Sequence, residues 1–129
     1  MWPFRKKKAD DQVHQKRRDA FGLLAIVSSQ CIGPDRLPVM HGTREHPNNV
    51  SDSGWVLSSG KESPEYSSDS RNFKLVPLEM MIQTDESLAV LRDFPEGTEV
   101  TRREITEPWR FISGEDVVDA DGKVVGRYK

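Results

Sequence analysis

The stretch DSGWVLSSGKESPEY, residues 52–66, contains the strand that organises the predicted fold. Its GWVLSS segment has a period of two, which places Trp55 and Leu57 on one face of a strand and their neighbours on the other. Because Leu57 needs a buried face, we interpret Trp55 as a core residue. A place for Trp55 on a binding face is the alternative. The serines and acids that follow predict a loop with one helical turn beginning at Pro64.

Further elements are predicted on both sides of this stretch. β-Branched and apolar runs bounded by turn residues predict strands at residues 23–32, 39–43, 98–105 and 109–112. Two valine pairs around an Asp-Gly turn predict a C-terminal hairpin. Leu78, Met81 and Ile82 have helical spacing after Pro77, and Asp85 can cap a second short helix. We therefore expect a helical region over residues 75–93.

These elements predict an α+β fold with a mainly antiparallel, twisted sheet of about five or six strands. One or two short helices are expected to pack on one side of it. A chain of 129 residues has room for one domain. Residues 1–18 are predicted to form a basic, mobile N-terminal segment, and residues 19–129 the single domain.

Charge is unevenly distributed along the chain, which has a net charge of -2. Residues 1–18 carry seven basic side chains against two acidic ones, and the remainder carries 12 basic against 19 acidic. An acidic body argues against nucleic acid as a partner. Weak peripheral contact of the basic N-terminus with an anionic membrane is left open.

No membrane span or secretion signal is predicted, because the longest apolar run covers only residues 23–27. Cys31 is the one cysteine and cannot form an internal disulfide, so a cytoplasmic location is expected.

No catalytic, cofactor or metal site is predicted. Cys31, His41, Glu45 and His46 could be drawn as zinc ligands, but spacing across a proline-containing loop sets no tetrahedral geometry. Residues 119–123, DADGK, are similar to the start of a calcium loop, but the chain ends before the closing acid. Neither a nucleophile elbow nor a glycine-rich phosphate loop is present. We therefore expect a protein that is not an enzyme.

Six short motifs follow one another along the chain. They occupy residues 53–55, 59–66, 69–72, 75–82, 85–88 and 95–98. In this order, over about residues 31–112, they resemble the immunity protein 33 family, formerly domain of unknown function 2185. The resemblance implies a small bacterial cytoplasmic protein, encoded near polymorphic toxins, that binds and neutralises a cognate toxin without catalysis.

Candidate partner-binding residues lie in and beside the polar loop. An acidic surface speeds association with a basic effector, and aromatic side chains often anchor interfaces. The candidates are Trp55, Glu62, Glu65, Tyr66 and Asp69. The alternative function is a regulatory module that binds a small ligand or a peptide around Trp55.

Overall fold

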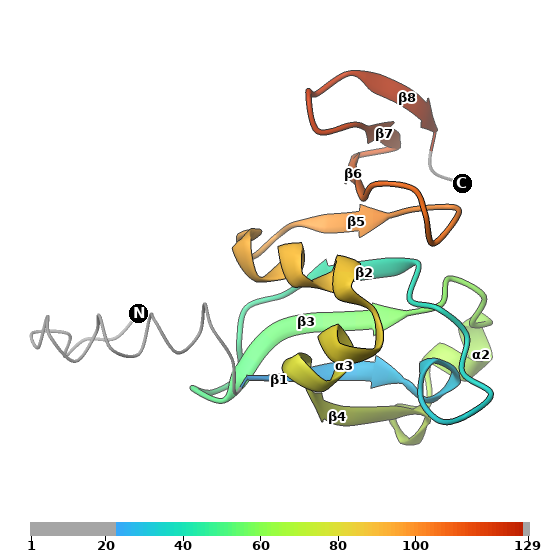
Figure 1. The fold of residues 1–129 in the computed structure, drawn as a ribbon, viewed down its shortest axis with the longest axis vertical. Helices are drawn as coiled ribbons and strands as arrows, with labels where there is room; N and C mark the ends of the chain where they lie inside the picture. Colours follow the sequence, from blue (N-terminus) through green and yellow to red (C-terminus); the bar gives the residue numbers. More distant parts are fainter. Residues whose placement is uncertain (1–22, 128–129) are drawn as a thin grey trace, which may run out of the picture.

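The structure of this chain, a computed structural model, describes residues 23–127. Within them one mixed sheet has the short helices of residues 78–93 on one face, as Figure 1 shows. The basic N-terminal segment predicted for residues 1–18 lies outside the described residues. So do residues 19–22 and 128–129 of the predicted domain.

Eight strands form the sheet, in the order β4-β1-β3-β2-β5-β6-β7-β8. The strands are β1 (Leu24–Ser28), β2 (His41–Arg44), β3 (Asp52–Ser58), β4 (Phe73–Pro77), β5 (Glu99–Thr101), β6 (Arg110–Ser113), β7 (Asp116–Val118) and β8 (Val124–Arg127). Strands β1 and β3 are parallel, and every other neighbouring pair is antiparallel. The prediction of a mainly antiparallel α+β sheet is confirmed, but the expected count of five or six strands was too low.

The helical region expected over residues 75–93 begins later than predicted. Residues 73–77 form strand β4 beside β1, and the helix α3 (Leu78–Thr84) starts directly after Pro77. A 3-10 helix, η3 (Glu86–Asp93), follows, with Asp85 as its N-cap as expected. Lys74 and Pro77 suit an edge strand, because a charge and a missing N–H both discourage further pairing. The apolar residues from Leu78 onward have helical spacing, so the prediction extended the helical region back over residues that form this strand.

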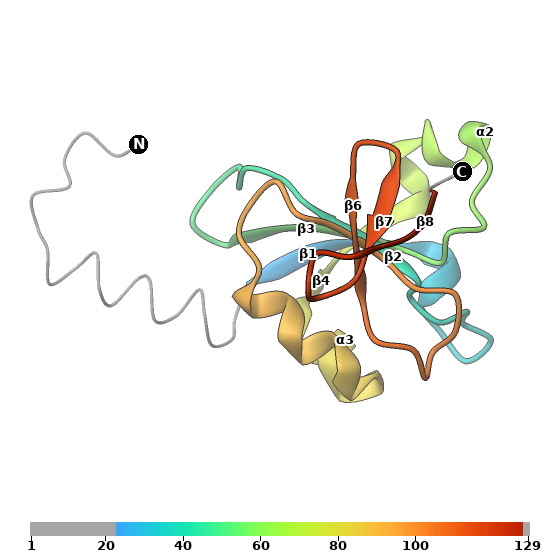
Figure 2. The ribbon, with the colours of Figure 1, turned by 90° about the horizontal axis from the view of Figure 1, so that it is seen from above.

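One face of the sheet is covered by α3 and η3, as Figures 1 and 2 show from two directions. The alternation predicted for β3 is confirmed, since Trp55 and Leu57 are fully buried and Val56 is only partly buried. The indole Nε1–H of Trp55 donates to the carbonyl of Leu91 in η3, at 3.0 Å. Buried residues of both layers form one apolar core around it. This hydrogen bond and the packing around it hold η3 against the sheet.

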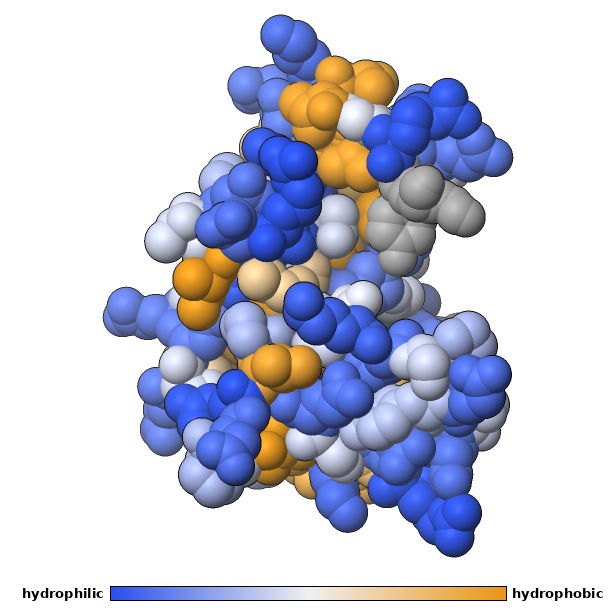
Figure 3. Space-filling view, turned by 90° about the vertical axis from the view of Figure 1, so that its right-hand side faces the viewer, coloured by the Kyte–Doolittle hydropathy of each residue, from blue (hydrophilic) through white to orange (hydrophobic). Residues whose placement is uncertain are grey.

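The predicted C-terminal hairpin is confirmed as β7 and β8, joined by a turn in which Gly122 has a φ of 85°. It extends the sheet away from the helices (Figure 1). Val124 and Val125 of β8 are exposed, and apolar side chains gather over this end of the molecule in Figure 3. Within the described residues, no helix has the length and apolar character needed to cross a membrane.

The residues before Trp55 shape β3 locally. The Asp52 carboxylate accepts from the Gly54 N–H at 2.8 Å, and the Ser53 hydroxyl accepts from the Trp55 N–H at 3.1 Å. Gly54 has a φ of 87°, and a side-chain carbon there would overlap the carbonyl oxygen of Glu45. The DSGW sequence therefore allows the close approach of β2 and β3 that directs the indole inward.

We predict that Gly54→Ala destabilises the fold by roughly 3 kcal/mol or more, because it combines a positive φ with a backbone overlap. The matched control is Gly97→Ala. Gly97 also has a positive φ, of 92°, but an added side-chain carbon would meet nothing within 4 Å. We expect that control to cost only about 1 to 2 kcal/mol. Urea unfolding of both variants measures the difference, and equal losses would contradict the role given to Gly54.

Candidate functional site

The predicted partner-binding residues separate into one core residue and four residues of a surface loop. Trp55 has no exposed surface, and its one polar group already bonds to Leu91. It therefore offers no face to a partner or a small ligand, and it does not belong to the candidate surface. The other four lie in residues 59–72, which we call the contact loop. The loop contains α2 (Pro64–Ser67), the predicted helical turn, and the 3-10 helix η2 (Ser70–Asn72).

Glu62 holds the start of the contact loop against the end of β3. Its Oε2 accepts from both the backbone N–H and the hydroxyl of Ser59, each at 3.0 Å. Partial burial alone would raise the pKa of Glu62, but hydrogen bonds from Ser28 and Ser59 outweigh it and leave that pKa lowered. The carboxylate is thus charged and already bound within the protein.

Asp69 and Tyr66 are also engaged inside the loop. Asp69 pairs with Arg71 through two contacts, of 2.8 and 3.0 Å, and the Arg71 hydrogen bonds lower the pKa of Asp69. The Tyr66 ring packs edge-on against Phe73, and its hydroxyl donates to the Asn72 carbonyl at 3.3 Å. Such internal contacts give the loop one defined shape.

Glu65 differs from these three residues because its side chain points to solvent. It is exposed, and no ion pair to it occurs within residues 23–127. Of the four candidates in the contact loop, Glu65 is the acid most available to a partner.

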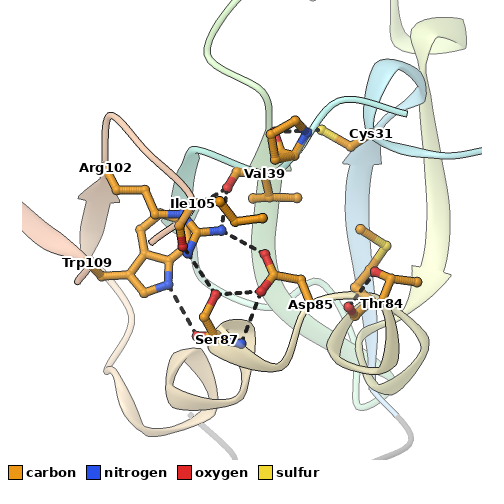
Figure 4. Close-up of polar contacts among 10 residues, drawn as sticks. Cys31, Val39, Thr84, Asp85, Ser87, Arg102, Ile105 and Trp109 are labelled. Atoms are coloured by element: carbon orange, nitrogen blue, oxygen red, sulfur yellow. Dashed lines mark hydrogen bonds and ion pairs between the residues drawn. The ribbon is translucent and has the colours of Figure 1, made fainter. Parts of the chain in front are cut away.

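A buried arginine, Arg102, forms a network of polar contacts with residues from several segments (Figure 4). The Arg102 side chain has no exposed surface and bonds to Asp85 Oδ2 at 2.7 Å. It also donates to the Ser87 hydroxyl at 2.7 Å, and to the carbonyls of Val39 and Ile105. These bonds tie β5 to η3 and to the segment before β2. Burying a guanidinium is costly unless its N–H groups are paired in this way.

Trp109 closes the Arg102 network, by which we mean Asp85, Ser87, Arg102 and Trp109. The guanidinium carbon lies 4.2 Å from the centroid of the Trp109 ring, a cation–π arrangement. The Trp109 Nε1–H donates to the Ser87 carbonyl at 3.3 Å. Asp85 was predicted as a helix cap, and the cap is confirmed. Its buried partner could not be predicted from local sequence, because Arg102 lies in a polar run that predicts an ordinary strand surface.

Partial burial alone would raise the pKa of Asp85. Hydrogen bonds from Ser87 and Arg102, together with the Arg102 charge, outweigh that effect and lower the pKa. Asp85 therefore stays ionised at neutral pH and balances the buried guanidinium.

Next to this network lies a cavity of about 370 Å³, which we call the Asp85 cavity. It opens between the segment after β1, the α3–η3 junction and the segment after β5. Its lining residues are Cys31, Pro34, Arg36, Leu37, Pro38, Val39, Met81, Thr84, Asp85, Leu88 and Ile105. In Figure 4 several of them, including Cys31, Val39, Thr84 and Ile105, lie around the space in front of Asp85.

The residues considered as zinc ligands lie apart in the structure. His41 bonds to Glu99 at 2.8 Å and His46 to Glu96 at 3.2 Å. Cys31 is buried, and burial, with a smaller effect of the Glu62 charge, raises the pKa of its thiol to about 12. That thiol is protonated at neutral pH and therefore a poor nucleophile. Among the described residues, no three or more His, Cys, Asp or Glu side chains lie together in a group that could hold a metal ion.

Comparison with known proteins gives one match. Residues 26–113 match the family model of the Immunity protein Imm33 domain. No curated protein and no solved structure matches the chain. The matched residues run from β1 to the end of β6, so they contain the contact loop, the Arg102 network and the Asp85 cavity. They leave out the β7–β8 hairpin.

We predict that Asp85→Asn lowers the free energy of unfolding by about 2 to 3 kcal/mol at pH 7, because Arg102 loses its buried countercharge. Asparagine is itself a good N-cap, so the substitution isolates the charge. The folded-state pKa of Asp85 is lowered, so its stabilising contribution is complete above the unfolded-state pKa of about 3.9 and is lost at lower pH. The difference between wild type and variant should therefore narrow below about pH 4.

Urea unfolding at a series of pH values measures this difference. Asp69→Asn is the control, because the Asp69–Arg71 pair is exposed and should contribute little. A loss for Asp85→Asn that stays constant from pH 7 to pH 3 would show that its charge is not the cause.

Proposed function

The chain belongs to the Imm33 family of immunity proteins of polymorphic toxin systems, and we propose that it binds and neutralises a cognate protein toxin without catalysing a reaction. The observation that carries this proposal is the family match across 88 of the 129 residues, from 26 to 113. We place the complex in the cytoplasm of the cell that makes the toxin.

Charge supports a basic protein as the partner. Residues 23–127 contain 18 acidic side chains against 11 basic ones. A surplus of this kind raises the association rate with a basic effector and disfavours binding to nucleic acid. Toxins that act on nucleic acids carry basic surfaces because they bind phosphate groups. Their charge is therefore complementary to the acidic surplus of this chain.

The contact loop is one proposed part of the toxin-binding surface. Glu65 supplies a free carboxylate, and Tyr66 and Asp69 lie on the same loop. Glu62 contributes by accepting two hydrogen bonds from Ser59, the first residue of the loop, which orders the loop where it leaves β3. Because internal bonds already order this loop, docking would cost little additional conformational entropy. Trp55 acts from beneath, by keeping β3 and η3 in place.

The ionisable groups of the described residues support a role in binding rather than in catalysis. The Cys31 thiol is buried and protonated, and both Asp85 oxygens accept bonds from Ser87 or Arg102. His41 and His46 each face a glutamate. Each of these groups is committed to a contact within the fold.

We predict that Glu65→Lys weakens binding to the toxin encoded beside this chain by roughly tenfold at low salt, because an exposed carboxylate is replaced by a cation. Asp121→Lys makes the same charge change in the hairpin outside the family match and should leave affinity nearly unchanged. Titration calorimetry at two salt concentrations measures both. Unchanged affinity for Glu65→Lys would remove the contact loop from the interface, and failure of the wild-type chain to bind would contradict the proposed function.

A further inference from the structure

The Asp85 cavity has a size and a lining suited to one large side chain. Its volume is about 370 Å³, and eight of its eleven lining residues are apolar, although polar and apolar atoms share the exposed wall almost equally. Cys31, Val39, Met81 and Leu88 are buried residues of the core that form part of this wall. At the mouth, Ile105 keeps 51% of its surface exposed. A cavity with a buried apolar wall that opens to solvent among exposed residues, Ile105 included, differs from a packing defect, which would be closed.

The polar side chains of the wall already have partners inside the protein. The Thr84 hydroxyl donates to the Met81 carbonyl at 2.8 Å. Asp85 Oδ1 accepts from Ser87, and Oδ2 accepts from Arg102. The Thr84 hydroxyl proton and both Asp85 oxygens are thus engaged within the protein, so this wall offers lone pairs that can accept further bonds but no free side-chain donor.

The opposite wall shows the same pattern. The Cys31 thiol lies 3.9 Å from the Pro38 carbonyl oxygen, and Arg36 donates to the Gly33 carbonyl at 3.3 Å. Pro34 and Pro38 have no backbone N–H to offer. The remaining Arg36 N–H groups are the free side-chain donors of this wall and can stay hydrated at its exposed edge, so an apolar or aromatic group can enter beside them without the loss of a hydrogen bond.

Acidic side chains follow the chain next to the cavity wall. Asp35, Glu86 and Glu104 are immediate neighbours of Arg36, Asp85 and Ile105. All three acids are exposed, and none forms an ion pair within the described residues. Nearby, Arg103 already faces Glu107 at 3.8 Å. Arg36 lines the cavity and is itself an exposed cation, so these three acids and Arg36 together leave an acidic excess beside the wall, which is complementary to a positively charged surface.

From this combination we propose that the Asp85 cavity receives one apolar or aromatic side chain that projects from the basic surface of the cognate toxin. The proposal rests on the proposed function and deepens it by naming the anchor point. Interfaces commonly place an aromatic or aliphatic anchor in a desolvated pocket and charged groups around its rim. All the lining residues fall within the segment that matches the family. The cavity thus belongs to the immunity domain and not to the added hairpin.

The first test replaces the exposed apolar side chain of Ile105 with a polar one and leaves the net charge unchanged. Ile105→Asn should weaken toxin binding by about tenfold in titration calorimetry, because the anchor loses apolar contact at the mouth. Val124→Asn is the matched control, since Val124 is exposed to a similar extent, 54%, but lies on β8. It should bind within about twofold of wild type. Normal binding by Ile105→Asn would overturn the proposal.

The second test observes the cavity directly in the intact chain. In protein labelled with ¹³C at methionine methyl groups, Met81 reports from the cavity wall, and the exposed neighbour Met80 is an internal control. Added indole, a small aromatic probe, should shift the Met81 resonance and leave Met80 nearly unchanged. The toxin should shift Met81 in the wild type and much less in Ile105→Asn.

The outcomes separate this inference from the function on which it rests. If the toxin binds and the Met81 resonance does not move, the anchor point is wrong and the function stands. If indole shifts Met81 but the toxin does not bind, both the function and the toxin anchor fail, and the cavity is a site for a small apolar ligand. A Met81 resonance that responds to neither probe contradicts the proposal.

Discussion

The hydrogen bond from the Trp55 indole to the Leu91 carbonyl, within a fully buried apolar contact, joins the two layers of this fold. The helical layer consists of α3 and η3, each at most eight residues long, and helices of that length are not stable alone in water. Their position therefore depends on what they pack against. Leu88 and Leu91 are buried beside the indole, and Asp85 caps the same helix. Any surface that includes η3 thus depends on Trp55.

The Arg102 network joins η3 to two further segments of the chain. A guanidinium without exposed surface must have its N–H groups paired, so its bonds fix three segments that are distant in sequence. The segment before β2, the start of η3 and the end of β5 meet around it, and together they form part of the cavity wall (Figure 4). A surface built on such constraints is ordered before a partner arrives, which reduces the entropic cost of binding.

Much of the fold follows from local patterns in the sequence. The alternation of Trp55 and Leu57, the cap at Asp85 and the Asp-Gly turn of the hairpin all act over a few residues, and the structure confirms them. Strand β4 was missed because it runs directly into a helix with stronger periodicity. The Arg102 network and the cavity depend on contacts across 15 to 63 residues, which no local pattern specifies. The family motifs mainly build caps, turns and loop contacts, as at Ser59, Asp69 and Asp85, so they predict the fold better than the binding surface.

Hydrogen–deuterium exchange of the free chain and of its complex with the neighbouring toxin tests most directly whether a preformed surface of the immunity domain does the binding. New protection should concentrate in residues 31–39, 84–88 and 102–105, with a contribution from residues 59–72. The amides of β1 and β3 should exchange slowly in both states, because the core around Trp55 does not reorganise. Protection confined to residues 116–127, or faster exchange in β3 on binding, would contradict this view of the protein.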